Sequence, residues 1–214
     1  MRSNKPRDEN SHCPRCYQRR EICICPILPT VQTKMQILIL RHIYEAERPS
    51  NTGRFVALAM PNSRIIPCGG GDRIGLPPVD DELLRAPGTM LLWPDGVGAD
   101  LSMSDLKPSS RIVVIDATWQ QARRLYRNMS ALRELPRLAL PAPKGRRERL
   151  REQRRSDGMS TLEAVAAAVA RLEGAEKAQP LEELYDELVR RTTSLRWGTR
   201  HAGTSLINRN NCHF

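Results

Sequence analysis

The segment RIVVIDATW occupies residues 111–119 and gives the strongest strand signal in the chain. Its apolar run, residues 112–115, is continuous rather than alternating, which is typical of a central parallel strand covered on both faces. Polar side chains follow at once with Asp116 and Thr118, and we expect a helix from about residue 118 to 128. A buried strand that leads into a helix indicates an α/β fold with a mostly parallel sheet.

Strands and helices are expected to alternate on both sides of this segment. Short apolar runs predict further strands at residues 35–40, 89–93 and 137–140. Helical patterns are found at residues 51–60, 160–172 and 181–195. Residues 67–88 contain three consecutive glycines and four prolines, so we expect a long loop or insertion there.

The expected helices carry recognisable start signals. Asn51 or Thr52 would cap the first of them. Ser160 followed three residues later by Glu163 has the spacing of a capping box. Pro180 stands near the start of the last helix, where its missing N–H costs little.

The composition is that of a folded, basic protein. The 214 residues include 34 Lys and Arg against 24 Asp and Glu, a formal charge of +10, which favours a polyanionic partner such as nucleic acid over a membrane surface. No apolar run approaches the roughly 18 residues of a membrane helix, and the start is polar throughout, so we expect a soluble, cytoplasmic protein. Only nine residues are aromatic, which argues against a module that reads bases on an aromatic platform.

Four of the six cysteines fall within 13 residues. Cys13 and Cys16 form a CxxC pair, and Cys23 and Cys25 form a tighter CxC pair. Four soft ligands suit a closed, tetrahedral structural Zn²⁺ site, and a reducing cytoplasm disfavours disulfides. Four reduced thiols in a loop, or His12 in place of one cysteine, are the alternatives. Cys68 and Cys212 are isolated and are expected to be free thiols.

Polar residues follow two of the expected strands. Residues 41–45 (RHIYE) and 50–54 (SNTGR) come after the first, and ligands of open α/β sheets bind beyond the carboxyl ends of strands. A turn and a helix cap explain this stretch equally well. Asp116 ends the strongest strand and could handle a proton, whereas the alternative makes Asp116 or Thr118 a helix cap and Trp119 a packing residue. Residues 91–95 (LLWPD) and 160–164 (STLEA) look structural when each is taken alone.

Taken in chain order, these motifs resemble the DTW-domain family of tRNA-uridine aminocarboxypropyltransferases. The six motifs are CxxC…CxC, HxxE, TGR, LLWPD, DATW and STLEA, and the match runs from about Cys13 to Leu188. The resemblance implies a SPOUT-like α/β fold with a mostly parallel sheet and a knotted carboxyl-terminal part. We expect a basic arm and a four-cysteine zinc module at 1–30, a SPOUT-like DTW catalytic domain at 31–196 and a polar tail at 197–214.

The resemblance also implies the chemistry. The family transfers the 3-amino-3-carboxypropyl group of S-adenosylmethionine to N3 of a tRNA uridine, which forms acp3U and releases methylthioadenosine. Asp116 is then the expected catalytic carboxylate, which takes or orients the N3 proton. The expected cofactor contacts are Thr52, Trp93, Leu140, Ser160 and Thr161.

A basic segment, residues 144–155, carries seven positive and two negative side chains. A solvated helix face explains this pattern, but a family that handles tRNA favours phosphate binding. The expected RNA contacts are Arg146, Arg147, Arg149, Arg151, Arg154 and Arg155. The family often has an aromatic residue before its Arg-x-Arg pair, whereas Glu148 stands there in this chain.

Two other functions remain open on the sequence alone. A SPOUT-type RNA methyltransferase would share the fold, the cofactor and the basic surface but would deposit a methyl group. A noncatalytic zinc-dependent RNA-binding protein would explain the charge and the cysteines, but it would leave the carboxylate of DATW without a role.

Overall fold

The computed structural model describes residues 10–71, 75–94, 110–141, 148, 150 and 158–198. Its centre is a sheet of five strands in the order β2-β1-β4-β3-β5, and every neighbouring pair is parallel. The strands are β1 (Gln36–His42), β2 (Ser63–Cys68), β3 (Thr89–Leu92), β4 (Arg111–Asp116) and β5 (Arg137–Leu138). The predicted α/β class with a parallel sheet is therefore confirmed.

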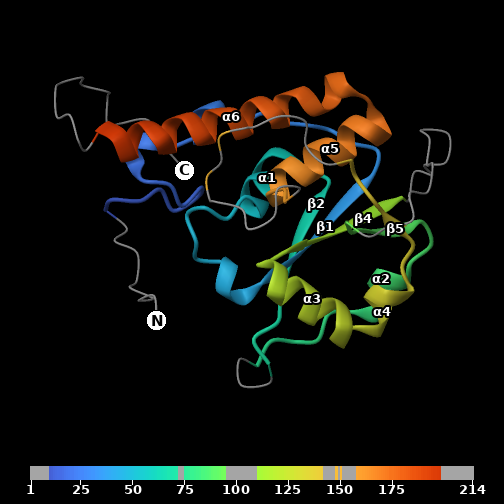
Figure 1. The fold of residues 1–214 in the computed structure, drawn as a ribbon. Coiled ribbons are helices and arrows are strands. Elements are labelled where there is room, and N and C mark those ends of the chain that lie inside the picture. Colours follow the sequence, from blue (N-terminus) through green and yellow to red (C-terminus); the bar gives the residue numbers. More distant parts are fainter. Residues whose placement is uncertain are drawn as a thin grey trace.

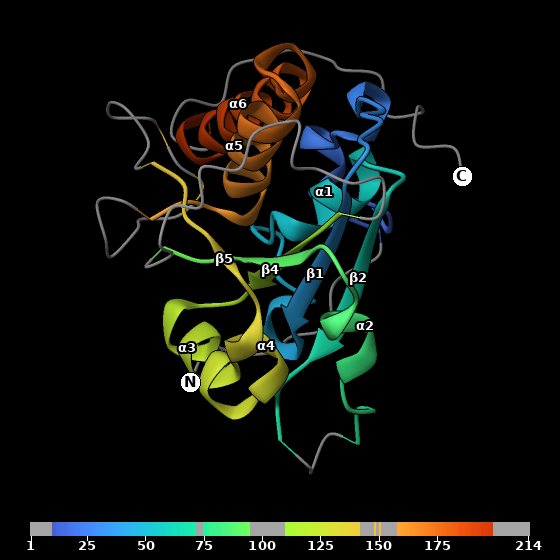
Figure 2. The same ribbon diagram turned by 90° about the vertical axis from the view of Figure 1, so that its right-hand side faces the viewer.

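Helices cover both faces of the sheet (Figures 1 and 2). One face carries α1 (Gly53–Ala59), α5 (Thr161–Glu173) and α6 (Ala175–Gly198), and the other carries α2 (Asp81–Arg85), α3 (Trp119–Asn128) and α4 (Ser130–Glu134). Strand β1 shows why two layers are needed: Ile37 and Ile39 pack into the first layer, and Leu38 and Leu40 into the second. Both sides of the strand are thus removed from water, as its continuous apolar pattern indicates.

The connections that follow β1 and β4 cross opposite faces of the sheet. From β1 it passes through α1 on one face to β2, and from β4 it passes through α3 and α4 on the other face to β5. Because β1 and β4 are neighbours, their carboxyl ends form a topological switch point, where open α/β sheets bind ligands.

Several predicted element boundaries were wrong. Residues 63–68 form β2, the edge strand, and 81–85 form α2, so part of the stretch predicted as a long loop is regular. Strand β5 is shorter than predicted, and α4 was not predicted. Helix α6 begins at Ala175 rather than Leu181 and contains Pro180 in its interior.

The cysteine-rich segment packs against the helical layer of α1, α5 and α6. It consists of loops and two short 3-10 turns, η1 (Arg20–Ile22) and η2 (Cys25–Ile27). Cys16 and Ile24 are fully buried in the same apolar core as α6, and Arg191 of α6 donates a hydrogen bond to the Cys23 carbonyl. We call residues 12–30 the cysteine module. Across the described part of the chain, no helix is both long and apolar enough to cross a membrane.

Candidate active site and metal site

Asp116 lies at the switch point, at the carboxyl end of β4. Its side chain is on the strand face that carries Ile112 and Val114, toward α1 and α5. Although the residue is only 5% exposed, both of its carboxylate oxygens have partners. Asn51 Nδ2 donates to Oδ2 over 2.5 Å, and Thr161 Oγ1 donates to Oδ1 over 2.6 Å. Two segments far apart in sequence, at Asn51 and Thr161, therefore fix the carboxylate at the end of β4.

The backbone of α1 approaches this carboxylate so closely that only glycine fits. A Cβ at Gly53 would lie 2.5 Å from Asp116 Oδ2 and 2.7 Å from Asp116 Cγ, closer than real Cβ contacts. Asn51 completes the arrangement, since its Oδ1 accepts from the Arg54 N–H over 3.1 Å while its amide holds Asp116. The SNTGR stretch is thus a helix start that packs closely against an acidic side chain, and ligand binding by this stretch stays a prediction.

Gly53→Ala is expected to destabilise the protein by about 2 kcal/mol, because the added methyl group must displace the Asp116 carboxylate. For a chain of this length that corresponds to a fall in melting temperature of about 6 °C. A thermal melt followed by circular dichroism measures it. In an Asp116→Ala background, most of the cost of Gly53→Ala should disappear. An equal cost in both backgrounds would contradict the contact.

A cavity of about 630 Å³ opens beside Asp116. This volume is within the usual range for small-molecule sites, roughly 300–1,000 Å³. All five expected cofactor contacts line it: Thr52, Trp93, Leu140, Ser160 and Thr161. Their role in binding stays a prediction. Among the described residues of the lining, the charged side chains are Glu45, Asp116 and Arg123.

Besides Thr161, two of the expected contacts make structural hydrogen bonds. Thr52 Oγ1 accepts from the Leu162 N–H over 3.2 Å, which ties the start of α5 to the start of α1. Ser160 accepts from the Glu163 N–H and Glu163 accepts from the Ser160 N–H, so the predicted capping box is confirmed. The cavity wall between α1 and α5 is therefore held in place by its own polar groups.

One wall of the cavity is aromatic. Trp93 stacks on Trp119 with 5.1 Å between ring centroids and on Tyr126 with 4.7 Å. Arg123 lies over the Trp119 ring at 5.6 Å. Thr118 caps α3 through a capping box with Gln121, so the cap lies at Thr118 rather than at Asp116. Trp119 does pack, as the structural alternative proposed, but it does so on the cavity wall.

Two further ionisable side chains, His42 and Cys68, end the strands β1 and β2. His42 ends β1 and is buried, and its Nδ1 accepts from the Tyr44 N–H over 3.3 Å. Burial lowers the pKa of His42, and the positive charges of Arg124 and Arg48 lower it further, so the ring is neutral at pH 7. Cys68 pairs with His42 across the β1–β2 ladder. Burial raises the pKa of its thiol to about 12, helped by the charge of Asp116, which leaves an unreactive free thiol.

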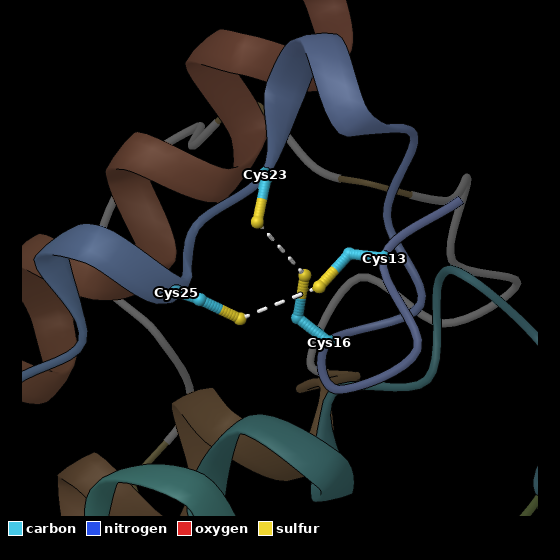
Figure 3. Close-up of side chains that lie close together, drawn as sticks. All are labelled: Cys13, Cys16, Cys23 and Cys25. Carbon is cyan, nitrogen blue, oxygen red and sulfur yellow. Dashed lines mark hydrogen bonds between the residues drawn. The ribbon is translucent and has the colours of Figure 1, made fainter. Parts of the chain in front are cut away.

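The four module cysteines converge on one point (Figure 3). Their sulfur atoms all lie within 4.8 Å of one another, with 3.6 Å between Cys13 and Cys25 and 3.7 Å between Cys16 and Cys23. Tetrahedral zinc with Zn–S bonds of about 2.3 Å requires sulfur separations of about 3.8 Å. The group could hold a metal ion, and its geometry is consistent with zinc. The ring of His12 lies against Ser11 instead, outside this group.

The thiols of the cluster titrate unequally. Burial opposes ionisation of Cys13, but backbone N–H groups of Cys16 and Arg15 lower its pKa to about 7. Burial raises the pKa of Cys25 to about 12, and the neighbouring thiols Cys16 and Cys13 raise it further. A cation among the sulfurs would remove this mutual repulsion, which is the electrostatic reason that four such thiols suit a divalent metal.

The expected RNA contacts lie outside the described residues. These are Arg146, Arg147, Arg149, Arg151, Arg154 and Arg155. The first nine residues of the basic arm, Asp95 of LLWPD and Cys212 also fall outside them. Leu150, within the same basic segment, is described, and it is buried against the cavity. The basic segment therefore meets the site at this residue.

Comparisons with known proteins agree on one family. A family model described as the DTW domain matches residues 10–193. The chain is 27% identical over 176 residues to a Macaca fascicularis protein named tRNA-uridine aminocarboxypropyltransferase 2, covering 79% of this chain and 59% of that one. Proteins of the same name from Mus musculus and Drosophila melanogaster are each 29% identical, covering 78% and 80% of this chain and 58% and 70% of theirs. The chain thus spans about three fifths of the length of the first two relatives. No solved structure matches.

Proposed function

Since the chain belongs to the DTW domain family, we propose that it is an enzyme that modifies tRNA. The reaction is transfer of the 3-amino-3-carboxypropyl group of S-adenosylmethionine to N3 of a uridine. One observation carries the proposal: the carboxylate of DATW is held between Asn51 and Thr161 beside a cavity of sufficient size for the donor. The relatives' name supports the type of group transferred. A SPOUT-like fold with a knot is part of the same proposal.

The charges of the cavity suit this donor. At neutral pH S-adenosylmethionine carries a sulfonium, an ammonium and a carboxylate. The described lining offers two carboxylates, Glu45 and Asp116, and one guanidinium, Arg123. Glu45 is buried and is backed by Arg48 at 3.1 Å. Attraction between unlike charges is strongest where water is excluded, so this lining favours a dicationic ligand with one anionic group.

The donor supplies a carbon bonded to a positively charged sulfur, which is a good leaving group, and methylthioadenosine departs. The protein has two tasks: to place the γ-carbon of the methionine chain, rather than the methyl group, in line with uridine N3, and to handle the N3 proton. Asn51 and Thr161 occupy one acceptor position on each oxygen of Asp116, so each oxygen keeps a further lone pair. Asp116 uses such a lone pair to take or orient the proton.

Incubation with unmodified tRNA and labelled S-adenosylmethionine tests the function. Nucleoside mass spectrometry is expected to show uridine with the mass of an aminocarboxypropyl group, together with methylthioadenosine. A methyl group with adenosylhomocysteine as by-product would instead identify a methyltransferase. Binding of tRNA without binding of the donor would identify a noncatalytic RNA-binding protein.

We assign the four module cysteines to one structural zinc ion, because all the ligand positions are taken by protein thiolates. The metal would fix the loops of the module, and it takes no part in the transfer. The tRNA would lie along the basic residues 144–155, which meet the cavity at Leu150.

Affinity for tRNA is expected to fall about 10²-fold or more when salt rises from about 50 mM to about 200 mM, through release of counterions from phosphates. Filter binding at several salt concentrations measures the slope. Replacement of six arginines by glutamine should flatten that slope, the positions being Arg146, Arg147, Arg149, Arg151, Arg154 and Arg155. Lysine at the same six positions keeps the charge and should keep the slope. An affinity that barely responds to salt would show that residues 144–155 do not bind the phosphates of tRNA.

A further inference from the structure

Arg54 lies at the junction of the cysteine module and the candidate active site. It belongs to α1, yet it is only 5% exposed, so its guanidinium is a buried cation. A buried charge is costly unless its hydrogen-bond donors are satisfied. The acceptors of its hydrogen bonds therefore show which parts of the chain the buried guanidinium connects.

Three backbone carbonyls from two separate segments accept from Arg54. Its NH2 group donates to the Ala46 carbonyl over 2.5 Å, and its NH1 group donates to the carbonyls of Arg48 and Cys16, each over 3.4 Å. Ala46 and Arg48 belong to the loop that follows β1, whereas Cys16 is a member of the sulfur cluster. One planar side chain thus joins the loop to the module.

The module makes two further contacts with the same region. The Tyr17 ring lies under the Arg54 guanidinium, 3.8 Å from its centroid, and its backbone has a φ of 65°, a left-handed conformation that side chains disfavour. Gln18 Nε2 donates to the Pro49 carbonyl over 2.6 Å. Three consecutive module residues, 16–18, therefore hold residues 46–54.

The loop leads directly to the carboxylate. The Asn51 N–H donates to the Arg48 carbonyl over 3.0 Å, and Asn51 Nδ2 donates to Asp116 Oδ2. The position of Asn51 thus depends on that of Arg48, one of the carbonyls that Arg54 binds. From these contacts we infer that Arg54 is a positioning residue, which passes the position of the cysteine module through residues 46–51 to Asp116.

This inference gives the module a role in the active site beyond its contribution to stability. A buried guanidinium suits that role better than an ammonium, since its planar fork can donate in several directions while one face stacks on a ring. Its effect on turnover rests on the proposed function. Its effect on the order of the loop does not.

Arg54→Lys tests the inference in the full-length, zinc-loaded chain. The amides of Arg48 and Asn51 report on the loop, because each donates to a loop carbonyl. Their protection from hydrogen exchange should fall about tenfold, while that of β4 stays unchanged. In transfer assays, kcat should fall about 10- to 100-fold and KM for tRNA should stay within about threefold. Arg64→Lys, at an exposed position on β2, is the matched control and should change neither quantity.

Tyr17→Gly is the second variant, because glycine adopts the left-handed backbone without strain and the substitution removes the ring that stacks on Arg54. It should loosen the same two amides while zinc content, measured by mass spectrometry, stays at one per chain. Removal of zinc by a chelator should expose them as well. Unchanged protection of Arg48 and Asn51 in both variants would overturn the inference, and so would loss of zinc from both. If the wild-type chain transfers no group to tRNA, the proposed function fails, whereas the exchange data still decide the role of Arg54.

Discussion

Asp116→Asn should reduce aminocarboxypropyl transfer on the order of 10³-fold, because a positioned general base contributes roughly 10²–10⁴-fold. The substitution keeps the shape of the side chain and removes the charge and the basicity. Single-turnover transfer to tRNA with saturating donor, followed by nucleoside mass spectrometry, measures the effect without a contribution from product release.

The fold should survive this substitution, because the partners of Asp116 can adapt. The new amide oxygen accepts from Asn51 Nδ2, and the new amide nitrogen donates to Thr161 Oγ1, whose hydroxyl can rotate. Donor affinity should change by less than about tenfold, or about 1.4 kcal/mol, since Glu45 remains in the cavity.

Asp186→Asn makes the same chemical change at an exposed position of α6, outside the cavity lining, and should transfer at the wild-type rate. Turnover of the Asp116 variant within tenfold of wild type would exclude a catalytic role for this carboxylate. A parallel loss of donor binding would instead make Asp116 a binding group for the donor.

Local features of the fold could be predicted from the sequence. The continuous apolar run 112–115 predicted a buried central strand, and the spacing of Cys13, Cys16, Cys23 and Cys25 predicted a cluster. Each signal is contained in one short stretch of sequence, so nothing about the distant chain is needed to interpret it. The same holds for the capping box at Ser160.

The failures arose where tertiary packing overrides a local signal. Strand β2 has only two adjacent isoleucines and a proline, a pattern tolerated at a sheet edge but weak as a strand signal. Pro180 suggested a helix start, yet α6 begins earlier, because its buried stripe already starts with Ala178 and continues through Leu181. Burial of that stripe outweighs the hydrogen bond that the proline cannot make.

The candidate site could be predicted only in part. Asp116 follows the apolar run 112–115, and its position at the carboxyl end of that strand made it a candidate for the active site. Asn51, 65 residues away, has no signal beyond its suitability as a cap, and its contact with the carboxylate exists only in the folded chain. Arg54 was visible in the TGR motif, but its links to Ala46 and Cys16 depend on the loop geometry.

Loss of the proposed zinc ion is the second change with a large expected effect. Zinc removal, or Cys16→Ser, should lower the melting temperature by about 10 °C or more, which for a chain of this length corresponds to about 3–5 kcal/mol. Thermal melting with metal analysis on the same samples measures it. Cys68→Ala removes a buried thiol outside the cluster, so it should keep one zinc per chain and lose less stability.

The size of this effect follows from where the module packs. Cys16 and Ile24 are fully buried in the same core as α1, α5 and α6, so disordering the module removes part of the cover of that layer. Metal binding should therefore stabilise this helical layer as well as the module. The melting temperature should rise with the concentration of free zinc. A chain freed of metal that melts at the original temperature would show that sulfur packing alone holds residues 12–30. If zinc restores the melting temperature of the metal-free chain and magnesium does not, the ligands are the thiolates, since magnesium prefers oxygen.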